Sequence, residues 1–261
     1  MKIHSNPIIF AGAGPGAPDL ITVRASKALE QADLVIYAGS LVPEAVLCWK
    51  ADDTRTVSSA GMNLGQIVEM MADYHGEGKR VVRLHTGDPS LYGAILEQMR
   101  ELDRLGIPYE VIPGVTAAFA AAASMSMEYT LPDLTQTLIL TRISGRTKVP
   151  DAENFESLAS HGASMAVYLS MAHVSGVQKA LEKHYGKDSL CAVAYKVSHP
   201  EEKIMTMKIR ELEKICRENS ITRHALIIVG KCVEAGMVSG DMIKSKLYDP
   251  AFSHGYRHQD G

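Results

Sequence analysis

The chain of 261 residues contains little cysteine and few aromatic residues. Its cysteines are scattered and include no Cys-x-x-Cys pair: Cys48, Cys191, Cys216 and Cys232. This spacing argues against a disulfide framework and against a zinc site, so we expect no bound metal and interpret all four as reduced thiols that fill the core. One Trp and four Phe also leave the chain without an aromatic-rich surface on which RNA bases would stack.

The chain lacks an excess of charge of either sign and any long hydrophobic run. A net charge of -3 gives no bulk electrostatic reason to bind nucleic acid or an anionic membrane. The longest apolar stretch, residues 115–123, is too short to span a bilayer. The start of the chain leads into a glycine turn rather than a cleavage-like end. We therefore expect a soluble cytoplasmic protein with no membrane and no nucleic-acid partner.

Two α/β domains are expected. Up to about residue 112, short β-branched runs alternate with amphipathic stretches, which is the pattern of βαβ units and a mainly parallel sheet. The first predicted domain covers residues 1–127. The second covers 128–240, where closely spaced strand candidates indicate a mixed sheet with antiparallel pairs, at 136–141, 164–169, 190–196, 203–207 and 225–229. Helices are expected near 151–160, 174–185 and 208–218. Residues 241–261 are polar and are predicted to form a tail.

Three strand-like runs, at 7–11, 80–85 and 109–112, end in turns rich in glycine and proline, and the last turn leads into a predicted helix of small residues at 115–127. The turns are Gly-Ala-Gly-Pro-Gly at 12–16, Thr-Gly-Asp-Pro-Ser-Leu-Tyr-Gly at 86–93 and Pro-Gly-Val-Thr-Ala at 113–117. Ligands of open α/β sheets bind just outside the carboxyl ends of the strands. Three such turns in one sheet therefore predict a small-molecule site, although a tight turn without a ligand is the plainer interpretation of the first.

The first turn does not fit a dinucleotide or nucleotide fingerprint. Pro15 has no N–H for a phosphate, and Ala38 ends the second strand where a ribose-binding carboxylate should stand. No Gly-Lys-Ser/Thr follows for a Walker loop. In the second turn, Gly87, Asp88 and Pro89 favour a cationic ligand, with Pro89 opening a helix at 91–105; the alternative is that Asp88 is a simple helix cap.

A basic loop follows an apolar strand in the second half. Arg142, Arg146 and Lys148 lie within residues 141–150. Because guanidinium groups bind carboxylates through two parallel hydrogen bonds, this loop could receive a polycarboxylate. A solvated basic loop is the alternative.

Together these motifs resemble the tetrapyrrole (corrin/porphyrin) methylase family, from about residue 7 to 233. The glycine turns, Leu-Ile-Thr at 20–22 and Tyr-Leu-Ser-Met at 168–171 carry the resemblance, and residues 37–43, 141–150 and 245–250 are similar to its precorrin-4 branch. The resemblance implies methyl transfer from S-adenosyl-L-methionine to ring carbon 11 of precorrin-4 or its cobalt complex, in cobalamin biosynthesis, with S-adenosyl-L-homocysteine as product. It also implies an active site in the cleft between the two domains, and a homodimer.

The resemblance assigns roles to particular residues. The donor-binding positions in the first domain are Pro15, Gly87, Asp88, Leu91, Thr116 and Ala117. Those in the second are Leu169 and Met171, with Ala194, Ser198 and Ala225 as further contacts. Arg142, Arg146 and Lys148 would bind the acetate and propionate arms of the tetrapyrrole substrate. Asp88, His85 or a bound water could accept the ring proton.

Other functions stay open at the level of sequence. The uroporphyrinogen-III C-methyltransferases of the same family have an aspartate and a lysine where this chain has Ala38 and Ser58, which weakens that assignment and bars transfer of its base. Diphthine and ribosomal RNA methylases are further rivals. A non-catalytic tetrapyrrole- or nucleotide-binding protein would keep the same turns without turnover. The polar tail slightly favours the cobalt-bound substrate.

Overall fold

A computed structural model describes residues 6–39, 41–235, 245 and 252–253. The chain divides into two compact units, Met1–Ala121 with Lys196–Glu202, and Ala122–Tyr195 with Lys203–Gly261. Of the predicted tail and of the motif at 245–250, only Ser245, Phe252 and Ser253 lie among the described residues. The domain bounds derived from the sequence stay a prediction.

The first unit is built on a parallel sheet of five strands. These are β1 (Ile8–Gly12), β2 (Leu34–Tyr37), β3 (Arg55–Ser58), β4 (Val81–His85) and β5 (Tyr109–Ile112). Their order is β3-β2-β4-β1-β5, and every pairing is parallel. The three strands that precede the glycine turns, β4, β1 and β5, are neighbours. The carboxyl ends of parallel strands meet at one edge of a sheet, so the topology brings the three turns together.

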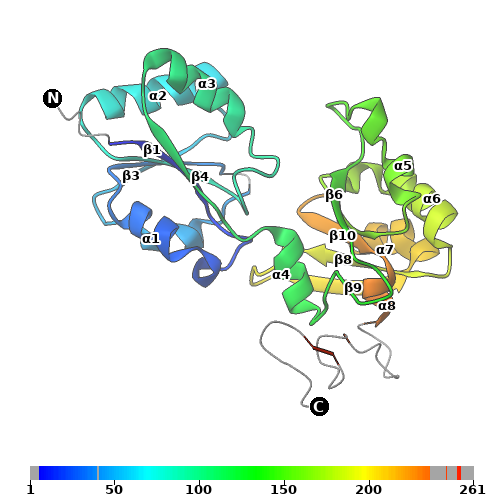
Figure 1. Ribbon diagram of the computed structural model, residues 1–261. Coiled ribbons are helices and arrows are strands. Elements are labelled where there is room, and N and C mark those ends of the chain that lie inside the picture. Colours follow the sequence, from blue (N-terminus) through cyan, green and yellow to red (C-terminus); the bar gives the residue numbers. More distant parts are fainter. Residues whose placement is uncertain (1–5, 40, 236–244, 246–251, 254–261) are drawn as a thin grey trace. The chain divides into compact units, whose positions relative to one another are not determined.

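Helices cover both faces of this sheet, as Figure 1 shows. Helix α1 (Val23–Glu30) and the 3-10 helix η2 (Glu44–Trp49) bury Leu29 and Val46 on one face. Helices α2 (Leu64–Gly76) and α3 (Ile95–Leu105) bury Met71 and Leu102 on the other. Strands enclosed on both sides are buried along their whole length. Every residue of β4 is buried, including the polar Arg83 and His85. The short 3-10 helix η1 (Pro18–Leu20) follows the first turn.

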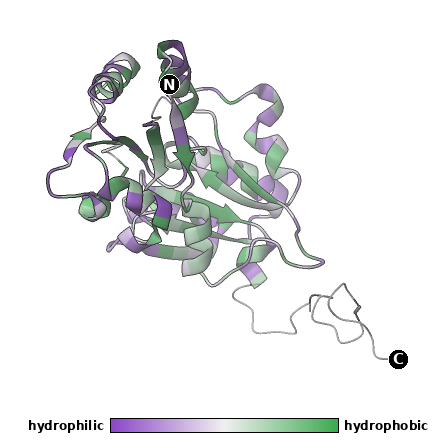
Figure 2. Ribbon diagram, turned by 60° about the vertical axis from the view of Figure 1, so that its left-hand side comes forward, coloured by the Kyte–Doolittle hydropathy of each residue, from purple (hydrophilic) through white to green (hydrophobic). Residues whose placement is uncertain are grey.

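The second unit is built on a mixed sheet, as predicted. Its strands are β6 (Leu138–Arg142), β7 (Ser164–Tyr168), β8 (Leu190–Tyr195), β9 (Lys203–Lys208) and β10 (Ala225–Val229), in the order β6-β7-β10-β8-β9. Only the β6–β7 pair is parallel, and the pairs of β10 with β7 and β8, and of β8 with β9, are antiparallel. Figure 2 shows hydrophobic residues gathered on the strands.

A large hydrophobic cluster lies in the described part of the second unit. Helices α5 (Phe155–Ala159), α6 (Val174–Tyr185) and α7 (Leu212–Glu218) contribute Phe155, Leu181 and Leu212 to it. The remaining helical segments are α4 (Ala117–Ser124), η3 (Asp151–Glu153), η4 (Met171–His173), η5 (Ile209–Glu211) and α8 (Lys231–Ala235). The boundary between the units falls inside α4.

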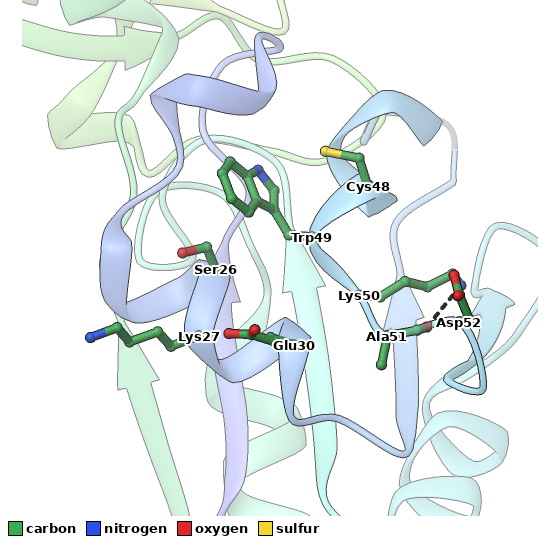
Figure 3. A pocket seen from close by; sticks show the side chains of 8 residues that line it. All are labelled: Ser26, Lys27, Glu30, Cys48, Trp49, Lys50, Ala51 and Asp52. Atoms are coloured by element: carbon green, nitrogen blue, oxygen red, sulfur yellow. Dashed lines mark hydrogen bonds between the residues drawn. The ribbon is translucent and has the colours of Figure 1, made fainter.

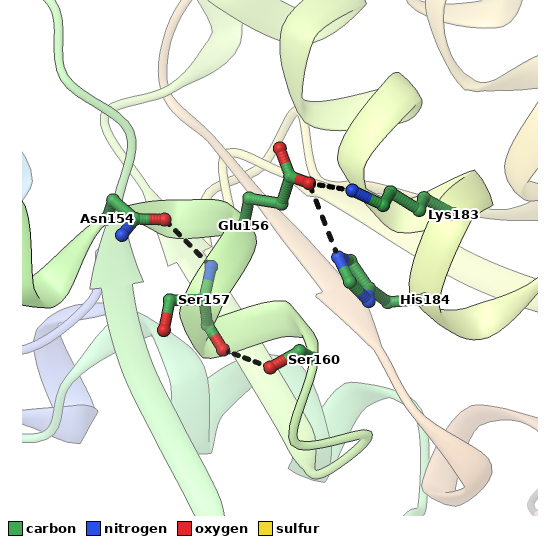
Figure 4. Close-up of polar contacts among 6 residues, drawn as sticks. All are labelled: Asn154, Glu156, Ser157, Ser160, Lys183 and His184. Atoms are coloured by element: carbon green, nitrogen blue, oxygen red, sulfur yellow. Dashed lines mark hydrogen bonds and ion pairs between the residues drawn. The ribbon is translucent and has the colours of Figure 1, made fainter.

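Polar contacts fix α5 beside α6 (Figure 4). Asn154 caps α5 by accepting the Ser157 N–H at 2.8 Å. Glu156 forms an ion pair with Lys183, and the His184 Nε2 lies 3.8 Å from the same carboxylate. The Lys183 ammonium lowers the pKa of Glu156 first through its hydrogen bond and then through its charge. This cluster is largely exposed, so it contributes little to the free energy of unfolding.

Three predicted helices have other bounds in the structure, and the prediction that all four cysteines are buried was wrong for one of them. The helix expected at 91–105 begins at Ile95, and the helix expected at 115–127 covers only Ala117–Ser124. The helix expected at 151–160 is a 3-10 turn followed by the short α5. Cys48 is exposed, whereas the other three cysteines are buried as expected. Within the described part of the chain, no helix combines the length and the apolar character that crossing a membrane requires.

Candidate functional site

Three glycines bring the turns of the first unit into direct backbone contact. A Cβ atom on Gly12 would lie 2.6 Å from both the Gly87 carbonyl oxygen and the Gly114 Cα. A Cβ atom on Gly114 would lie 2.1 Å from the same Gly87 oxygen. No side chain fits at such distances, so glycine is required at positions 12 and 114. We call Gly12, Gly87 and Gly114 the glycine node.

Backbone hydrogen bonds join the first turn to the second. The Ala13 N–H donates to the His85 carbonyl at 2.7 Å. Gly14 and Gly87 then form an isolated bridge, in which the Gly87 N–H donates to Gly14 at 2.8 Å. Both glycines lie in the left-handed region, with φ of +77° and +59°. These bonds set the two turns in one fixed arrangement at the ends of β1 and β4.

Asp88 joins the second turn to the third. Its carboxylate accepts the Gly114 N–H at 2.9 Å, the Ser90 N–H at 2.8 Å and the Ser90 hydroxyl. Burial raises the pKa of this carboxyl, but the hydrogen bonds from Ser90 and Gly114 outweigh burial, so the net pKa lies below its ordinary value. Asp88 is therefore an anion that organises the turns. It does not cap the helix that follows.

The second turn continues through a strained segment to Ala94. Tyr92 and Ala94 have φ of 59° and 49°, and a Cβ atom on Gly93 would lie 2.1 Å from the Pro89 carbonyl oxygen. Because of this segment α3 starts at Ile95, six residues after Pro89, so the prediction that Pro89 opens the helix was wrong. Non-glycine residues adopt this conformation at a cost of about 1–3 kcal/mol, and such residues gather at ligand sites. Leu91 lies half-buried at the start of the segment.

His85 is the last residue of β4 and is 4% exposed. Its Nε2 atom is buried and has no hydrogen-bond partner in the structure. Burial, followed by the charge of Arg83, lowers the pKa of His85 to about 3. The imidazole is therefore neutral at physiological pH. Arg83 is itself buried and donates to Gln98 Oε1 and to the Ile36 carbonyl, both at 3.1 Å.

The remaining first-unit residues lie at the same edge of the sheet. Pro15 is buried between Gly14 and Gly16 in the first turn. Thr116 is 8% exposed, and its carbonyl accepts the Phe119 and Ala120 N–H groups, which starts α4 at Ala117. The structure thus brings together Pro15, Gly87, Asp88, Leu91, Thr116 and Ala117 around the glycine node. Their role in donor binding stays a prediction.

In the second unit, Leu169 follows β7 in a strained conformation. It has a φ of 51°, and its side chain is 63% exposed, whereas Met171 is 6% exposed. Between them Ser170 donates its hydroxyl to the Tyr168 carbonyl at 2.6 Å and accepts the Ile143 N–H at 2.9 Å. Ser170 therefore ties the end of β7 to the start of the basic loop. Sequence reasoning missed this residue, and its position beside two predicted donor contacts was the available signal.

The basic loop is organised by one of its own arginines. The Arg142 guanidinium donates to the Thr147 and Lys148 carbonyls, both at 3.0 Å. Arg142 is half-buried, whereas Arg146 and Lys148 are exposed. The Ser144 hydroxyl accepts the Val149 N–H at 3.0 Å and closes the loop. Arg146 and Lys148 are thus held out on a loop that Arg142 shapes.

The three further donor contacts lie in different surroundings. Ala194 is 1% exposed within β8, and Ala225 is half-buried at the start of β10, where it pairs with Tyr195. Ser198 belongs to the first unit, and its hydroxyl accepts the Ala17 N–H at 2.9 Å. Ser198 therefore joins the residues around the first glycine turn, whereas the Ala194 side chain is enclosed in the sheet.

Two surface hollows of the first unit do not coincide with these turns. One, of about 630 Å³, lies beside α1 and η2, and Trp49 is among the residues that line it (Figure 3). The Trp49 indole N–H donates to the Pro18 carbonyl at 2.9 Å. The other, of about 310 Å³, is lined by Arg24 and Glu110 among others. No predicted site residue lines either hollow. Among the described residues, no group of three or more His, Cys, Asp or Glu could hold a metal ion.

A family model described as tetrapyrrole (corrin/porphyrin) methylases matches residues 7–213. The chain belongs to this family, as the sequence predicted. In this chain a neutral His85 and a hydrogen-bonded Asp88 lie beside the glycine turns. It is 44% identical over 255 residues to the cobalt-precorrin-4 C(11)-methyltransferase of Methanocaldococcus jannaschii, covering 97% of each chain. It is 43% identical over 250 residues to the precorrin-4 C(11)-methyltransferase of Pseudomonas aeruginosa, covering 96% of this chain and 98% of that one.

A solved structure agrees with these relatives. The crystal structure of a cobalamin biosynthetic enzyme, a cobalt precorrin-4 methyltransferase, matches with a TM-score of 0.85 and 44% identity. The match covers 88% of this chain and 96% of that chain. The two α/β units, one with a parallel sheet and one with a mixed sheet, are therefore the tetrapyrrole methylase fold.

Proposed function

We propose that this chain transfers a methyl group from S-adenosyl-L-methionine to ring carbon 11 of precorrin-4 or its cobalt complex, in cobalamin biosynthesis. The observation that carries the proposal is 43–44% identity, over at least 96% of the chain, to two curated proteins with that activity in their names. The glycine node supports it, because the turns that would hold the donor are built in the first unit. By the same resemblance we propose a cytoplasmic homodimer.

The chemistry of the turns suits a sulfonium donor. When bound, S-adenosyl-L-methionine supplies an activated methyl group on a positively charged sulfur. The turns present carbonyl oxygens and an anionic Asp88, and Pro15 removes one N–H that a phosphate would need. We propose that Pro15, Gly87, Asp88, Leu91, Thr116 and Ala117 hold the donor, with Leu169, Met171, Ser198, Ala194 and Ala225 as further contacts.

Catalysis rests mainly on positioning. In-line displacement requires the ring carbon and the methyl group at near-attack distance, and holding two reactants in this geometry supplies a large part of the rate enhancement. The hydrogen bonds between the turns serve this purpose, because the Gly87 and Gly114 N–H groups each have a partner in another turn and the Ala13 N–H donates to the end of β4. The donor would therefore meet a site that needs little rearrangement.

The ring proton must pass to an acceptor. A good acceptor has a pKa near the working pH. The pKa of Asp88 is lowered and its oxygens accept three hydrogen bonds, while the pKa of His85 is about 3 and its Nε2 is buried. Both residues are weak bases at neutral pH. Of the three candidates, these values favour a bound water that Asp88 or His85 orients.

The basic loop would bind the carboxylate arms of the macrocycle. Arg146 and Lys148 are exposed and can reach a ligand, while the Arg142 donors that point to Thr147 and Lys148 keep the loop in shape. We propose that Arg146 and Lys148 contact acetate and propionate groups directly and that Arg142 contributes mainly by shaping the loop.

Methyl transfer to defined substrates tests the proposal. The purified protein is mixed with methyl-labelled S-adenosyl-L-methionine and, in parallel, precorrin-4, cobalt-precorrin-4 or uroporphyrinogen III. We expect label in the macrocycle and stoichiometric S-adenosyl-L-homocysteine with one or both precorrin-4 forms. Transfer to uroporphyrinogen III alone would assign another activity of the family. Tetrapyrrole binding without transfer to any of the three would indicate a non-catalytic binding protein.

A further inference from the structure

A loop that joins β8 to β9 belongs to the first unit. Residues Lys196–Glu202 leave the second sheet after Tyr195 and return at Lys203. Within the first unit, the Ser198 hydroxyl accepts the Ala17 N–H at 2.9 Å. The next residue, His199, packs its ring against Gly16: a Cβ atom there would lie 2.3 Å from Cδ2 and 2.7 Å from Nε2. The loop thus sits directly on the first glycine turn.

The loop holds its own shape through internal contacts. The Ser198 N–H donates to Glu202 Oε2 at 2.5 Å, and the Glu202 N–H donates to the His199 carbonyl at 3.0 Å. The Lys196 ammonium pairs with Glu201 at 2.9 Å. Lys196 and Ser198 have φ of 45° and 63°, a strained conformation that persists only where surrounding contacts enforce it. These contacts fix the direction in which Ser198 and His199 face the turn.

We infer that His199 is a positioning residue for the methyl donor and that it acts through its ring rather than through proton transfer. The inference rests on the proposed function. The His199 ring occupies the space in which a side chain on residue 16 would lie, so Gly16 and His199 are a complementary pair. The Ser198 hydroxyl fixes Ala17, which is the residue after Gly16. Together they hold the Gly14-Pro15-Gly16 backbone in the arrangement that the donor meets.

A missing ring would free this backbone. Glycine loses more conformational freedom on ordering than any other residue. Without His199, ordering Gly16 would be left to the donor, and the cost would appear as weaker binding. A planar ring of similar size, such as that of phenylalanine, keeps the packing but carries no ring nitrogen. His199→Phe therefore separates packing from acid–base chemistry.

Calorimetric titration with S-adenosyl-L-homocysteine tests the inference. We expect His199→Ala and Gly16→Ala each to weaken binding about tenfold, and His199→Phe to bind within about twofold of the unmodified protein. The double variant Gly16→Ala/His199→Ala should bind no more weakly than either single variant, because removal of the ring leaves room for the new methyl group. Gly61→Ala is the matched control, since nothing lies within 4 Å of its added Cβ.

Kinetics provide a second readout. In His199→Ala, the KM for S-adenosyl-L-methionine should rise while kcat, its pH profile and the KM for the tetrapyrrole stay unchanged. If His199→Ala does not fold, His199→Phe against His199→Leu decides the same question, with only the planar ring retaining affinity. Unchanged affinity in His199→Ala, or equal losses in the Ala and Phe variants, would overturn the inference. If the unmodified protein does not bind S-adenosyl-L-homocysteine, the proposed function fails and the inference fails with it.

Discussion

The Asp88 carboxylate accepts the Gly114 N–H at 2.9 Å and so holds the turn after β4 against the turn after β5. The same carboxylate accepts two hydrogen bonds from Ser90 within its own turn. Asp88 thus fixes two of the three segments proposed to bind the methyl donor. A residue that sequence analysis offers as a base is, in the structure, an organiser of the site.

Replacing Asp88 by asparagine should weaken the site without a change of size. The NH₂ of the new amide cannot accept a hydrogen bond, so the N–H of either Gly114 or Ser90 loses its acceptor. Hydrogen bonds to charged groups contribute about 1.5–3 kcal/mol. We expect S-adenosyl-L-homocysteine affinity to fall about tenfold or more, measured by calorimetry. Asp52→Asn, at an exposed turn, is the control and should bind normally. Equal affinity in the two variants would remove Asp88 from the donor site.

The lowered pKa of the Asp88 carboxyl determines how donor binding should depend on pH. A carboxyl whose folded pKa is depressed stabilises the fold above its unfolded pKa and loses that contribution as the pH falls through the folded value. Donor affinity should therefore stay constant from neutral pH down to about pH 4, the ordinary carboxyl range. Calorimetric titrations with S-adenosyl-L-homocysteine at several pH values check this expectation. A loss of affinity with a midpoint above the ordinary carboxyl range would contradict the role of Asp88 as an anion that organises the turns.

His85 should make the fold less stable in mild acid. Its pKa is about 3 in the folded chain and near 6.5 when unfolded, so the unfolded state binds the extra proton between these values. The stability that neutral His85 contributes to the fold is fully present above the unfolded pKa and is lost as the pH falls toward the folded pKa. Denaturant unfolding should show a slope of up to about 1.4 kcal/mol per pH unit from this group. His85→Gln should flatten the curve by that amount, and an unchanged slope would show that His85 titrates normally.

Gly114→Ala should damage the glycine node. The new methyl group would lie 2.1 Å from the Gly87 carbonyl oxygen, and backbone atoms on both sides leave it no room. We expect the free energy of unfolding to fall by about 1–3 kcal/mol, as for other overpacked sites, with donor affinity lost as well. Gly76→Ala, where nothing lies within 4 Å, is the control and should leave both quantities nearly unchanged. Similar losses of unfolding free energy and of donor affinity in the two variants would show that the glycine node does not exclude a side chain.

The two arginines of the basic loop should behave differently. Arg146→Ala removes an exposed charge, so the KM for the tetrapyrrole should rise several-fold with an unchanged Tm. Arg142→Ala removes the donors to Thr147 and Lys148, so the Tm should fall together with the rise in KM. Steady-state kinetics and thermal unfolding distinguish them. An unchanged tetrapyrrole KM in Arg146→Ala would exclude direct contact with the carboxylate arms.

The sequence predicted the strands of both sheets well, because their residues are apolar and bounded by turn residues. Tyr109–Ile112 and Ala225–Val229 match the structure at both ends. The edge strand β3 was missed, since three of its four residues are exposed and its sequence carries no apolar signal. The glycine and proline residues of the turns also predicted which edge of the first sheet carries the candidate ligand site. There the backbones of Gly12, Gly87 and Gly114 are in close contact.

Other parts of the site depend on contacts between distant residues. The Asp88–Gly114 bond joins positions 26 apart, and the Ser198–Ala17 bond joins positions 181 apart. No local pattern indicates either pairing. The late start of α3 was likewise hidden, because Tyr92 and Ala94 adopt a left-handed conformation that their residue types disfavour. Local preference was overridden here by the packing of Gly93 against Pro89.

We propose that the three glycine turns of the first unit together form the methyl-donor site. Selective ¹⁵N-glycine labelling allows each turn to be followed by NMR during titration with S-adenosyl-L-homocysteine. We expect saturable shifts of the Gly14, Gly16, Gly87 and Gly114 signals, while the Gly61 and Gly76 signals stay unchanged. Saturable binding that leaves all four of those signals in place would contradict it.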